Sequence, residues 1–235
     1  DMNILILGDV VGSSGREALK KKLKTIIKEK NIDFTVVNGE NADNTGRGIT
    51  KENSNGFFDL GVDVITSGNH IWDQKETMTF IENEKRLLRP YNLTKGSPGK
   101  GFGIFQTKNK KFKIAVINLM GNIFMKKCDD LFQAASQLKN LVRLRKDADF
   151  IIVDIHGEIT SEKMALGHFF DGEATVVVGT HTHVPTSDTH ILKGGTAYQT
   201  DLGMCGDYDS VIGMNKDNSL MRFFKNENAK RHSPA

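Results

Sequence analysis

The fold class is decided by the stretch Asn3-Ile4-Leu5-Ile6-Leu7-Gly8-Asp9, a short apolar run that ends abruptly in a polar residue. A continuous apolar run of this length is typical of a strand buried on both faces, as in parallel sheets. After a glycine-rich turn, apolar residues recur at helical spacing from Leu19 to about Lys30. The lysines among them are interpreted as a solvated helix face rather than an RNA-binding patch. The chain therefore begins with a strand followed by a helix.

The same unit follows twice more. A strand over 33–37 ends in Asn38-Gly39-Glu40-Asn41, and a strand over 62–66 ends in Ser67-Gly68-Asn69-His70. Thr50 is predicted to cap the helix between them, and Asp73 the helix after them. Repeated strand-helix units predict an α/β domain with a mostly parallel sheet. Ligands of such sheets collect at the carboxyl ends of the strands.

The second half continues with less regular elements. We expect a hairpin, a helix, a strand ending at His156, a helix, and a strand ending in Gly179-Thr180-His181-Thr182-His183. Two short strands and a final strand complete the prediction. The expected ranges are 101–106 and 112–119 for the hairpin, then 129–144, 150–155, 160–170, 174–178, 189–192, 196–199 and 220–224.

Composition places limits on the class of protein. The 235 residues are 38% hydrophobic and 26% charged, so we expect one soluble domain over 1–228 and a loose tail over 229–235. The net charge of +3 favours an anionic substrate but falls short of a nucleic-acid coat. No apolar run approaches the length of a membrane span, and no signal peptide is recognised. Two distant cysteines in no metal-binding pattern favour a reducing cytoplasm.

Polar residues at five strand ends form the candidate site. A lone histidine is more often a core or surface residue, and the His-Thr-His pair alone could equally be a surface turn. Taken together, these residues offer a shell of oxygen and nitrogen atoms without thiolate, which suits manganese, iron or zinc. They are too many for one ion, so two ions sharing a carboxylate fit better. The candidates are Asp9, Glu40, Asn41, Asn69, His70, His156, His181 and His183.

In this order the blocks resemble the calcineurin-like metallophosphoesterase superfamily: Gly8-Asp9, Gly39-Glu40-Asn41, Gly68-Asn69-His70, His156 and Gly179-Thr180-His181-Thr182-His183. Two further stretches narrow the resemblance to its bacterial YmdB-like branch: Gly68 through Glu76 and Ala197 through Met204. The resemblance extends to about Met214. It implies a four-layer α-β-β-α sandwich of two packed mixed sheets, with a dinuclear metal centre at the strand ends.

Two positions depart from the usual superfamily pattern. Val11 stands where the first block normally has a histidine, and Glu40 stands where the second normally has a bridging aspartate. Both changes are expected in the YmdB-like branch, with Asn41 compensating for the lost imidazole. Replacing the nitrogen of an imidazole ligand with the side-chain oxygen of Asn41 favours binding of iron or manganese over zinc. The resemblance implies that metal one is held by Asp9, Glu40, Asn41 and His183, and metal two by Glu40, Asn69, His156 and His181.

The resemblance leaves His70 without a metal. As an imidazolium beside the ions it could bind a phosphate oxygen or protonate the leaving alkoxide, so it is the predicted catalytic residue. Asp73 is interpreted as a helix cap rather than a catalytic group. Arg47 and Gly48 follow the bridging Glu40 in a loop that could touch substrate.

The branch implies a phosphodiesterase that hydrolyses cyclic nucleotides of the 2′,3′-cyclic AMP type by in-line attack of a metal-bridging hydroxide. One alternative is a metal-dependent nuclease acting on RNA, or a phosphomonoesterase, with the same metals. Another is a regulatory module without catalysis. We expect no membrane partner, and the sequence leaves open whether the chain forms a homo-oligomer.

Overall fold

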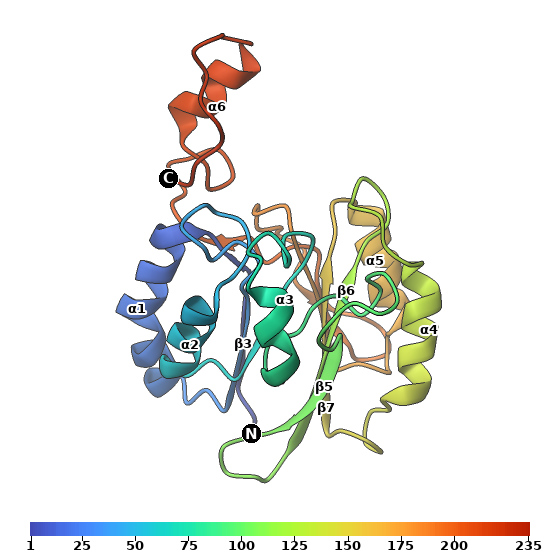
Figure 1. Ribbon diagram of the computed structural model, residues 1–235. Helices are drawn as coiled ribbons and strands as arrows, with labels where there is room; N and C mark the ends of the chain where they lie inside the picture. Colours follow the sequence, from blue (N-terminus) through green and yellow to red (C-terminus); the bar gives the residue numbers. More distant parts are fainter.

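The structure is a computed structural model that describes residues 1–235. Two β-sheets pack against each other, and helices cover their outer faces (Figure 1). The smaller sheet has three parallel strands in the order β1-β3-β4: β1 (Ile4–Leu7), β3 (Phe34–Asn38) and β4 (Val64–Thr66). A two-stranded parallel ribbon joins β2 (Asp9–Val10) to β11 (Met204–Cys205).

The larger sheet is mixed and has the strand order β5-β6-β7-β8-β10-β9. Its central strands run parallel, whereas β5 and β9 are antiparallel edge strands. The expected hairpin is confirmed as the pair β5 and β6. The bounds are β5 (Phe102–Gln106), β6 (Lys113–Met120), β7 (Phe150–His156), β8 (Val176–Thr180), β9 (His190–Ile191) and β10 (Ala197–Gln199).

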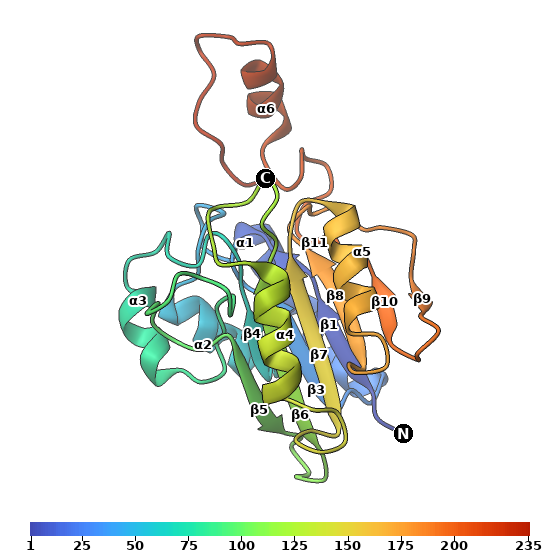
Figure 2. The ribbon, with the colours of Figure 1, turned by 90° about the vertical axis from the view of Figure 1, so that its right-hand side faces the viewer.

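Helices lie on both sides of the paired sheets, as the two perpendicular views show (Figures 1 and 2). On the outer side of the smaller sheet are α1 (Gly12–Glu29), α2 (Lys51–Asp59), α3 (Thr77–Phe80) and the 3-10 helix η1 (Ile81–Asn83). On the outer side of the larger sheet are α4 (Leu131–Leu141) and α5 (Thr160–Phe169). Helix α6 (Lys216–Phe223) projects from the body of the molecule.

Three apolar clusters correspond to the three contacts between layers. The cluster between the sheets joins Phe34 and Val36 of β3 to Val116 of β6 and Ile152 of β7, all almost fully buried. Separate clusters join each sheet to its own helices. Full burial of each such side chain stabilises the fold by about 1.5–3 kcal/mol. The predicted four-layer α-β-β-α arrangement is therefore confirmed.

The strand register brings the polar strand ends together. Strands β1, β3 and β4 run parallel, as do β6, β7 and β8, so their carboxyl ends lie at one edge of the sandwich. In that register His156 lies beside Thr180, and Asp9 lies beside Met204 of the ribbon. Side chains from distant parts of the sequence thus meet at this edge.

The predicted strand over 220–224 is wrong, because this stretch lies in and after α6. The side chain of Asn215 caps α6 by accepting a hydrogen bond from the N–H of Asn218. Leu220, Phe223 and Phe224 repeat at helical spacing, but a run this short does not distinguish helix from strand. Asn215, as a helix-capping residue, was the sequence feature that favoured a helix over a strand here.

The last two residues contact other parts of the chain. The N–H of Ala235 donates to the carbonyl of Gly213 over 2.9 Å, and Pro234 pairs with Met214 in an antiparallel bridge. The hydroxyl of Ser14 also donates to the carbonyl of Ala235. None of the helices combines the length and hydropathy that a membrane span needs.

Candidate metal centre

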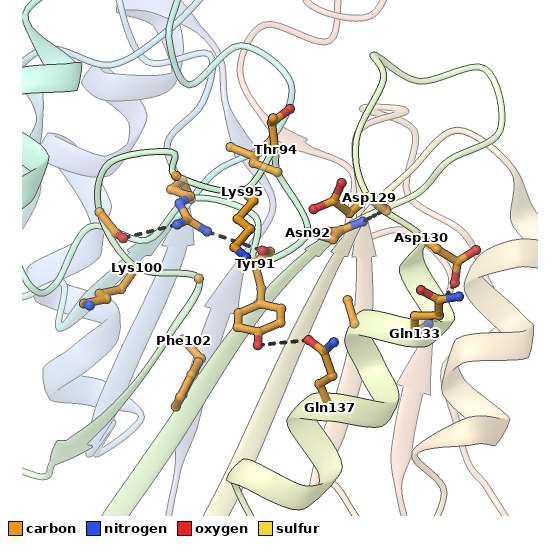
Figure 3. Close-up of a pocket in the computed structure, with 16 residues that line it drawn as sticks. Tyr91, Asn92, Thr94, Lys95, Lys100, Phe102, Asp129, Asp130, Gln133 and Gln137 are labelled. Atoms are coloured by element: carbon orange, nitrogen blue, oxygen red, sulfur yellow. Dashed lines mark hydrogen bonds between the residues drawn. The ribbon is translucent and has the colours of Figure 1, made fainter.

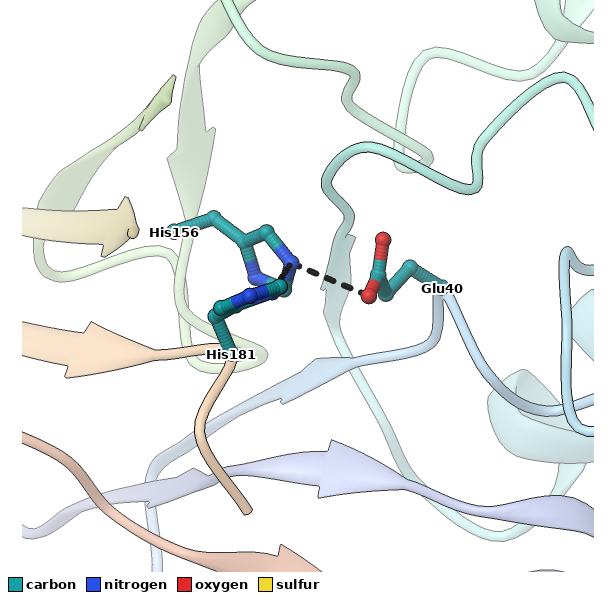
Figure 4. Close-up of side chains that lie close together, drawn as sticks. All are labelled: Glu40, His156 and His181. Atoms are coloured by element: carbon teal, nitrogen blue, oxygen red, sulfur yellow. Dashed lines mark hydrogen bonds and ion pairs between the residues drawn. The ribbon is translucent and has the colours of Figure 1, made fainter. Parts of the chain in front are cut away.

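The seven predicted metal ligands meet at the carboxyl edge of the two sheets. They come from β2, from the ends of β3, β4 and β7, and from the turn after β8. In Figure 4, Glu40, His156 and His181 converge, and their ligand atoms all lie within 4.8 Å of one another. The others adjoin these three through the contacts described below. The predicted ligands are Asp9, Glu40, Asn41, Asn69, His156, His181 and His183.

One group of acceptor atoms is formed by Asp9, Asn41 and His183. Nε2 of His183 lies 3.2 Å from Oδ1 of Asn41 and 3.9 Å from Oδ1 of Asp9. Nδ1 of His183 donates to the carbonyl of Ile212, so Nε2 of the neutral ring carries no proton. The amide of Asn41 donates to the carbonyl of Gly46, which turns its oxygen toward His183. Oδ1 of Asp9 is buried without any hydrogen-bond partner. Three acceptors that face one another fit a cation.

A second group surrounds His156. Its Nε2 lies 3.0 Å from Oε1 of Glu40, 2.9 Å from Oδ1 of Asn69 and 3.2 Å from Nδ1 of His181. Behind the ring, Nδ1 donates to the hydroxyl of Thr180, which in turn donates to a carboxylate inside the sheet. This chain of hydrogen bonds orients the ring, so that Nε2 faces the group.

The carboxylate behind His156 belongs to Asp154, which is buried in β7. Its oxygens accept hydrogen bonds from the hydroxyls of Thr66 and Thr180 and from the amide of Asn38. Burial raises the pKa of Asp154 in spite of these donors. Asp154 was not predicted as part of the site, although an acid inside an otherwise apolar strand was a detectable signal.

Burial and mutual charge shift the pKa values of the site. Burial raises the pKa of Asp9 to about 6, against the charges of His183 and His156. Burial acts in the same direction on Glu40, but His156 outweighs it and lowers that pKa to about 2. Burial and then the charge of His156 lower the pKa of His181 to about 3. His181 is therefore neutral at physiological pH, which is the form that binds metal.

The pKa of His156 moves the other way. Burial acts to lower it, but the charge and hydrogen bond of Glu40 outweigh burial and raise it to about 9. In the metal-free protein a proton therefore sits on this ring at neutral pH. Nε2 of this ring lies 3.0 Å from Oε1 of Glu40 and 2.9 Å from Oδ1 of Asn69, which are both predicted metal ligands.

Backbone geometry directs the two histidines of the turn to different groups. His181 has a φ of +106° and His183 a φ of +66°, a region that residues other than glycine rarely adopt. As a result Nδ1 of His181 faces His156, whereas Nε2 of His183 faces Asn41. Such strain is retained where the surroundings hold it, often at functional sites.

Gly68 allows the ring of His156 to approach the end of β4. A β-carbon at position 68 would lie only 2.1 Å from Cδ2 of the imidazole and 2.4 Å from its Nε2. No side chain can be accommodated at that distance. The glycine before Asn69 is therefore required for two ligands from different sheets to meet.

His70 lies beside the predicted metal ligands. Its backbone N–H donates to Oε2 of Glu40 over 2.8 Å, and its Nδ1 lies 2.8 Å from Oδ2 of Asp73. The interpretation of Asp73 as a helix cap is wrong, because α3 begins only at Thr77 and is preceded by Glu76. Asp73 orients the imidazole instead.

Two charged residues near the site were missed in the sequence. Nζ of Lys126 lies 2.8 Å from the carbonyl of Asn69 and 3.4 Å from Oδ1 of Asp73. Oε2 of Glu158 lies 2.8 Å from Nε2 of His181. Glu158 follows His156 by two positions, which was a weak signal, whereas nothing in the sequence connects Lys126 with the strand ends.

The loop after Glu40 packs behind the site. The N–H of Gly48 donates to the carbonyl of Glu40, and the carbonyl of Arg47 accepts from the side chain of Gln74. A β-carbon at Gly48 would lie 2.8 Å from Cγ of Gln74. These contacts fix the loop, while a contact of Arg47 with substrate stays a prediction.

A groove of about 680 Å³ lies elsewhere, beside α4 (Figure 3). Tyr91, Phe102 and Gln137 line it, and none of the predicted site residues does. The guanidinium of Arg89, which lines the groove, already donates hydrogen bonds to backbone carbonyls of the surrounding loop, including those of Pro98 and Ser97. The groove is therefore distinct from the candidate metal centre.

Comparison with known proteins identifies the family. A model of the YmdB-like protein family matches residues 5–235. The chain belongs to the YmdB-like family. It is 46% identical over 228 residues to the 2′,3′-cyclic-nucleotide 2′-phosphodiesterase of Bacillus subtilis (strain 168), and the match covers 96% of this chain and 83% of that protein. The resemblance to the YmdB-like branch is thereby confirmed.

Solved structures support the same YmdB-like fold. A hypothetical protein from Thermus thermophilus superposes with a TM-score of 0.90 at 38% identity, over 100% of this chain and 88% of that one. A protein described as a novel phosphatase from Mycoplasma pneumoniae gives a TM-score of 0.89 at 36% identity, over 100% and 83% respectively. The metallophosphoesterase superfamily implies divalent metal ions, and the acceptor groups described above fit them.

For this YmdB-like chain we expect metal binding to release protons. The pKa of His156 is about 9 and that of Asp9 about 6, so binding of Mn²⁺ at the predicted ligand His156 requires displacement of its proton below pH 9. Affinity should rise about tenfold per pH unit between roughly pH 6.5 and 8.5 for one displaced proton. Calorimetry at several pH values, in buffers with different ionisation enthalpies, measures both quantities.

The raised pKa of His156 also makes the stability of the metal-free protein depend on pH. Because the folded pKa of His156 lies above its ordinary value of 6.5, the stabilisation by its protonated ring is fully present below pH 6.5. This stabilisation is lost as the pH rises through about 9.

The metal-binding prediction would be contradicted if Mn²⁺ affinity did not change with pH and no protons were released.

Proposed function

We propose that this chain is a phosphodiesterase that uses two bound metal ions to hydrolyse small phosphodiesters of the 2′,3′-cyclic nucleotide type. The observation that carries the proposal is the buried, unpaired Oδ1 of Asp9, which faces His183 beside a second group of acceptors around His156. The relatives named as phosphodiesterase or as putative phosphatase/phosphodiesterase support the enzyme class predicted from the sequence.

We assign the two acceptor groups to two ions. Asp9, Asn41 and His183 would hold the first, and Asn69, His156 and His181 the second. Glu40 would bridge them, which is supported by its burial and its 3.0 Å contact with His156. Oxygen-rich shells of this kind favour iron or manganese, with zinc as the alternative. When bound, such ions polarise the phosphate and lower the pKa of a water molecule.

Residues of the chain itself supply the remaining chemistry. The carboxylate of Asp73 lies 2.8 Å from Nδ1 of His70 and orients the imidazole. Nε2 is then the atom that donates a proton to the leaving oxygen as its bond to phosphorus breaks. The ammonium of Lys126, held beside Asp73, adds positive charge for an anionic substrate.

The proposal is tested by comparing substrates after loading the purified protein with Mn²⁺ or Fe²⁺. We expect turnover of 2′,3′-cyclic AMP and of bis-p-nitrophenyl phosphate to exceed that of p-nitrophenyl phosphate and of single-stranded RNA. Removal of metal with a chelator should abolish it, and returning the metal should restore it. Faster cleavage of RNA would indicate a nuclease, and faster cleavage of the monoester a phosphomonoesterase. Metal binding without any hydrolysis would indicate a regulatory module.

A further inference from the structure

Beneath the turn that carries His181 and His183 lies a fully buried ion pair. Nζ of Lys163, on α5, lies 2.9 Å from Oδ2 of Asp201, and the two side chains are 0% and 1% exposed. Replacing such a pair with well-packed apolar residues is often neutral or even stabilising, so fold stability alone does not account for it. Its role is better sought in the groups that the pair contacts.

The carboxylate of Asp201 holds the turn at its midpoint. Oδ2 accepts a hydrogen bond of 3.0 Å from the N–H of Thr182, and Oδ1 accepts one of 2.8 Å from the N–H of Gly203. Thr182 lies between His181 and His183, the two histidines with positive φ. A turn with two residues at positive φ requires a contact that stabilises it. At its centre that contact is made by the carboxylate of Asp201, which is itself held by Lys163.

The stem of Lys163 passes between two strand ends of the site. A β-carbon at Gly179 would lie 2.8 Å from Cδ of Lys163, and one at Gly157 would lie 3.6 Å from its Cε. Gly157 directly follows His156, and Gly179 lies two positions before His181. The lysine is thus packed under the backbone that carries three of the histidines.

We propose that Lys163 and Asp201 are positioning residues that hold the 181–183 turn in its metal-binding conformation. The inference rests on the metal centre of the proposed function. Lys163 compensates the buried charge of Asp201, Asp201 fixes the N–H of Thr182, and the turn then directs one imidazole to each acceptor group. Neither residue touches metal or substrate. Outer residues that orient ligands in this way typically contribute 10–100-fold to metal affinity.

The test measures Mn²⁺ affinity by calorimetry, together with the melting temperature of the metal-free protein. Lys163→Met keeps the apolar stem and removes the charge, and should weaken Mn²⁺ binding about 10–100-fold. Asp201→Asn should also weaken it. In the double variant Lys163→Met/Asp201→Asn no uncompensated charge is buried, so affinity should recover by about tenfold relative to Lys163→Met. Lys139→Met, which removes the lysine of an ion pair with Glu173 outside the site, is the matched control.

The outcomes separate positioning from a purely structural role. A lower melting temperature with unchanged Mn²⁺ affinity in Lys163→Met would overturn the inference, as would a double variant that lost affinity additively. If Lys163→Met does not fold, Asp201→Asn decides: weaker Mn²⁺ binding than in the wild type supports the inference, and unchanged affinity overturns it. The readout is independent of hydrolysis. A wild type that binds Mn²⁺ but cleaves no substrate would refute the proposed function and leave this test intact.

Discussion

Glu40→Gln is expected to lower kcat/KM for 2′,3′-cyclic AMP roughly 1000-fold, because the loss of a bound metal removes several kcal/mol of transition-state stabilisation. Glu40 lies within hydrogen-bonding distance of His156 and accepts the N–H of His70, so it connects the second acceptor group to the predicted acid. The amide keeps the size of the side chain but carries no negative charge. Elemental analysis should show that bound metal falls from about two ions to about one or fewer.

The control for this change is Glu82→Gln, which makes the same chemical replacement at an exposed residue whose carboxylate contacts the N–H of Gly99. It should retain both metal content and turnover. A Glu40→Gln protein with two ions and undiminished activity would show that Glu40 is not a bridging ligand. In the metal-free state, removing Glu40 also removes the main cause of the raised pKa of His156, so that pKa should fall.

His70→Asn should lower kcat for 2′,3′-cyclic AMP by about 10²–10⁴-fold, the usual contribution of a general acid. The change leaves the backbone N–H that donates to Glu40, so metal content should remain as in the wild type. The leaving oxygen of a cyclic nucleotide is a poor leaving group that needs a proton. The leaving group of bis-p-nitrophenyl phosphate is stable as an anion, so the loss of rate with that substrate should be much smaller.

This difference between substrates is the signature of an acid, and a merely structural histidine would not produce it. Asp73→Asn should reproduce part of the effect, because Asp73 orients the ring of His70. His168→Asn, at an exposed position on α5, is the control and should change neither rate. Equal losses with both substrates in His70→Asn would assign the residue to binding the phosphate instead.

The sequence was sufficient to predict that these polar residues lie close together, because of where parallel strands end. Each apolar run stopped at a polar residue, and a shared strand direction brings such ends to one edge of the structure. Asp9, Glu40 and His156 could be placed together on that argument alone. The resemblance to the metallophosphoesterases then supplied the pairing of ligands, which the contacts of Asn41 with His183 and of Asn69 with His156 support.

Residues that act through loops could not be predicted in the same way. The role of Asp73 depended on where α3 begins, and helix boundaries are poorly determined by sequence pattern. Lys126 reaches the site from a loop after β6, more than fifty positions from the groups it contacts. Lys163 and Asp201 are informative only once their burial is known, because charged residues in a sequence are usually on the surface.

The absence of a β-carbon at Gly68 has a consequence for how the metal preference of this enzyme could be altered. The imidazole of His156 fills the space that a β-carbon at Gly68 would take, so this side chain packs directly against the backbone of the neighbouring sheet. A bulkier ligand at position 156 would push the end of β4 away and carry Asn69 with it, while a smaller one would leave a void behind the ion. Redesign of the proposed second metal position would therefore change residues 68, 69 and 156 together, as one unit shared by both sheets.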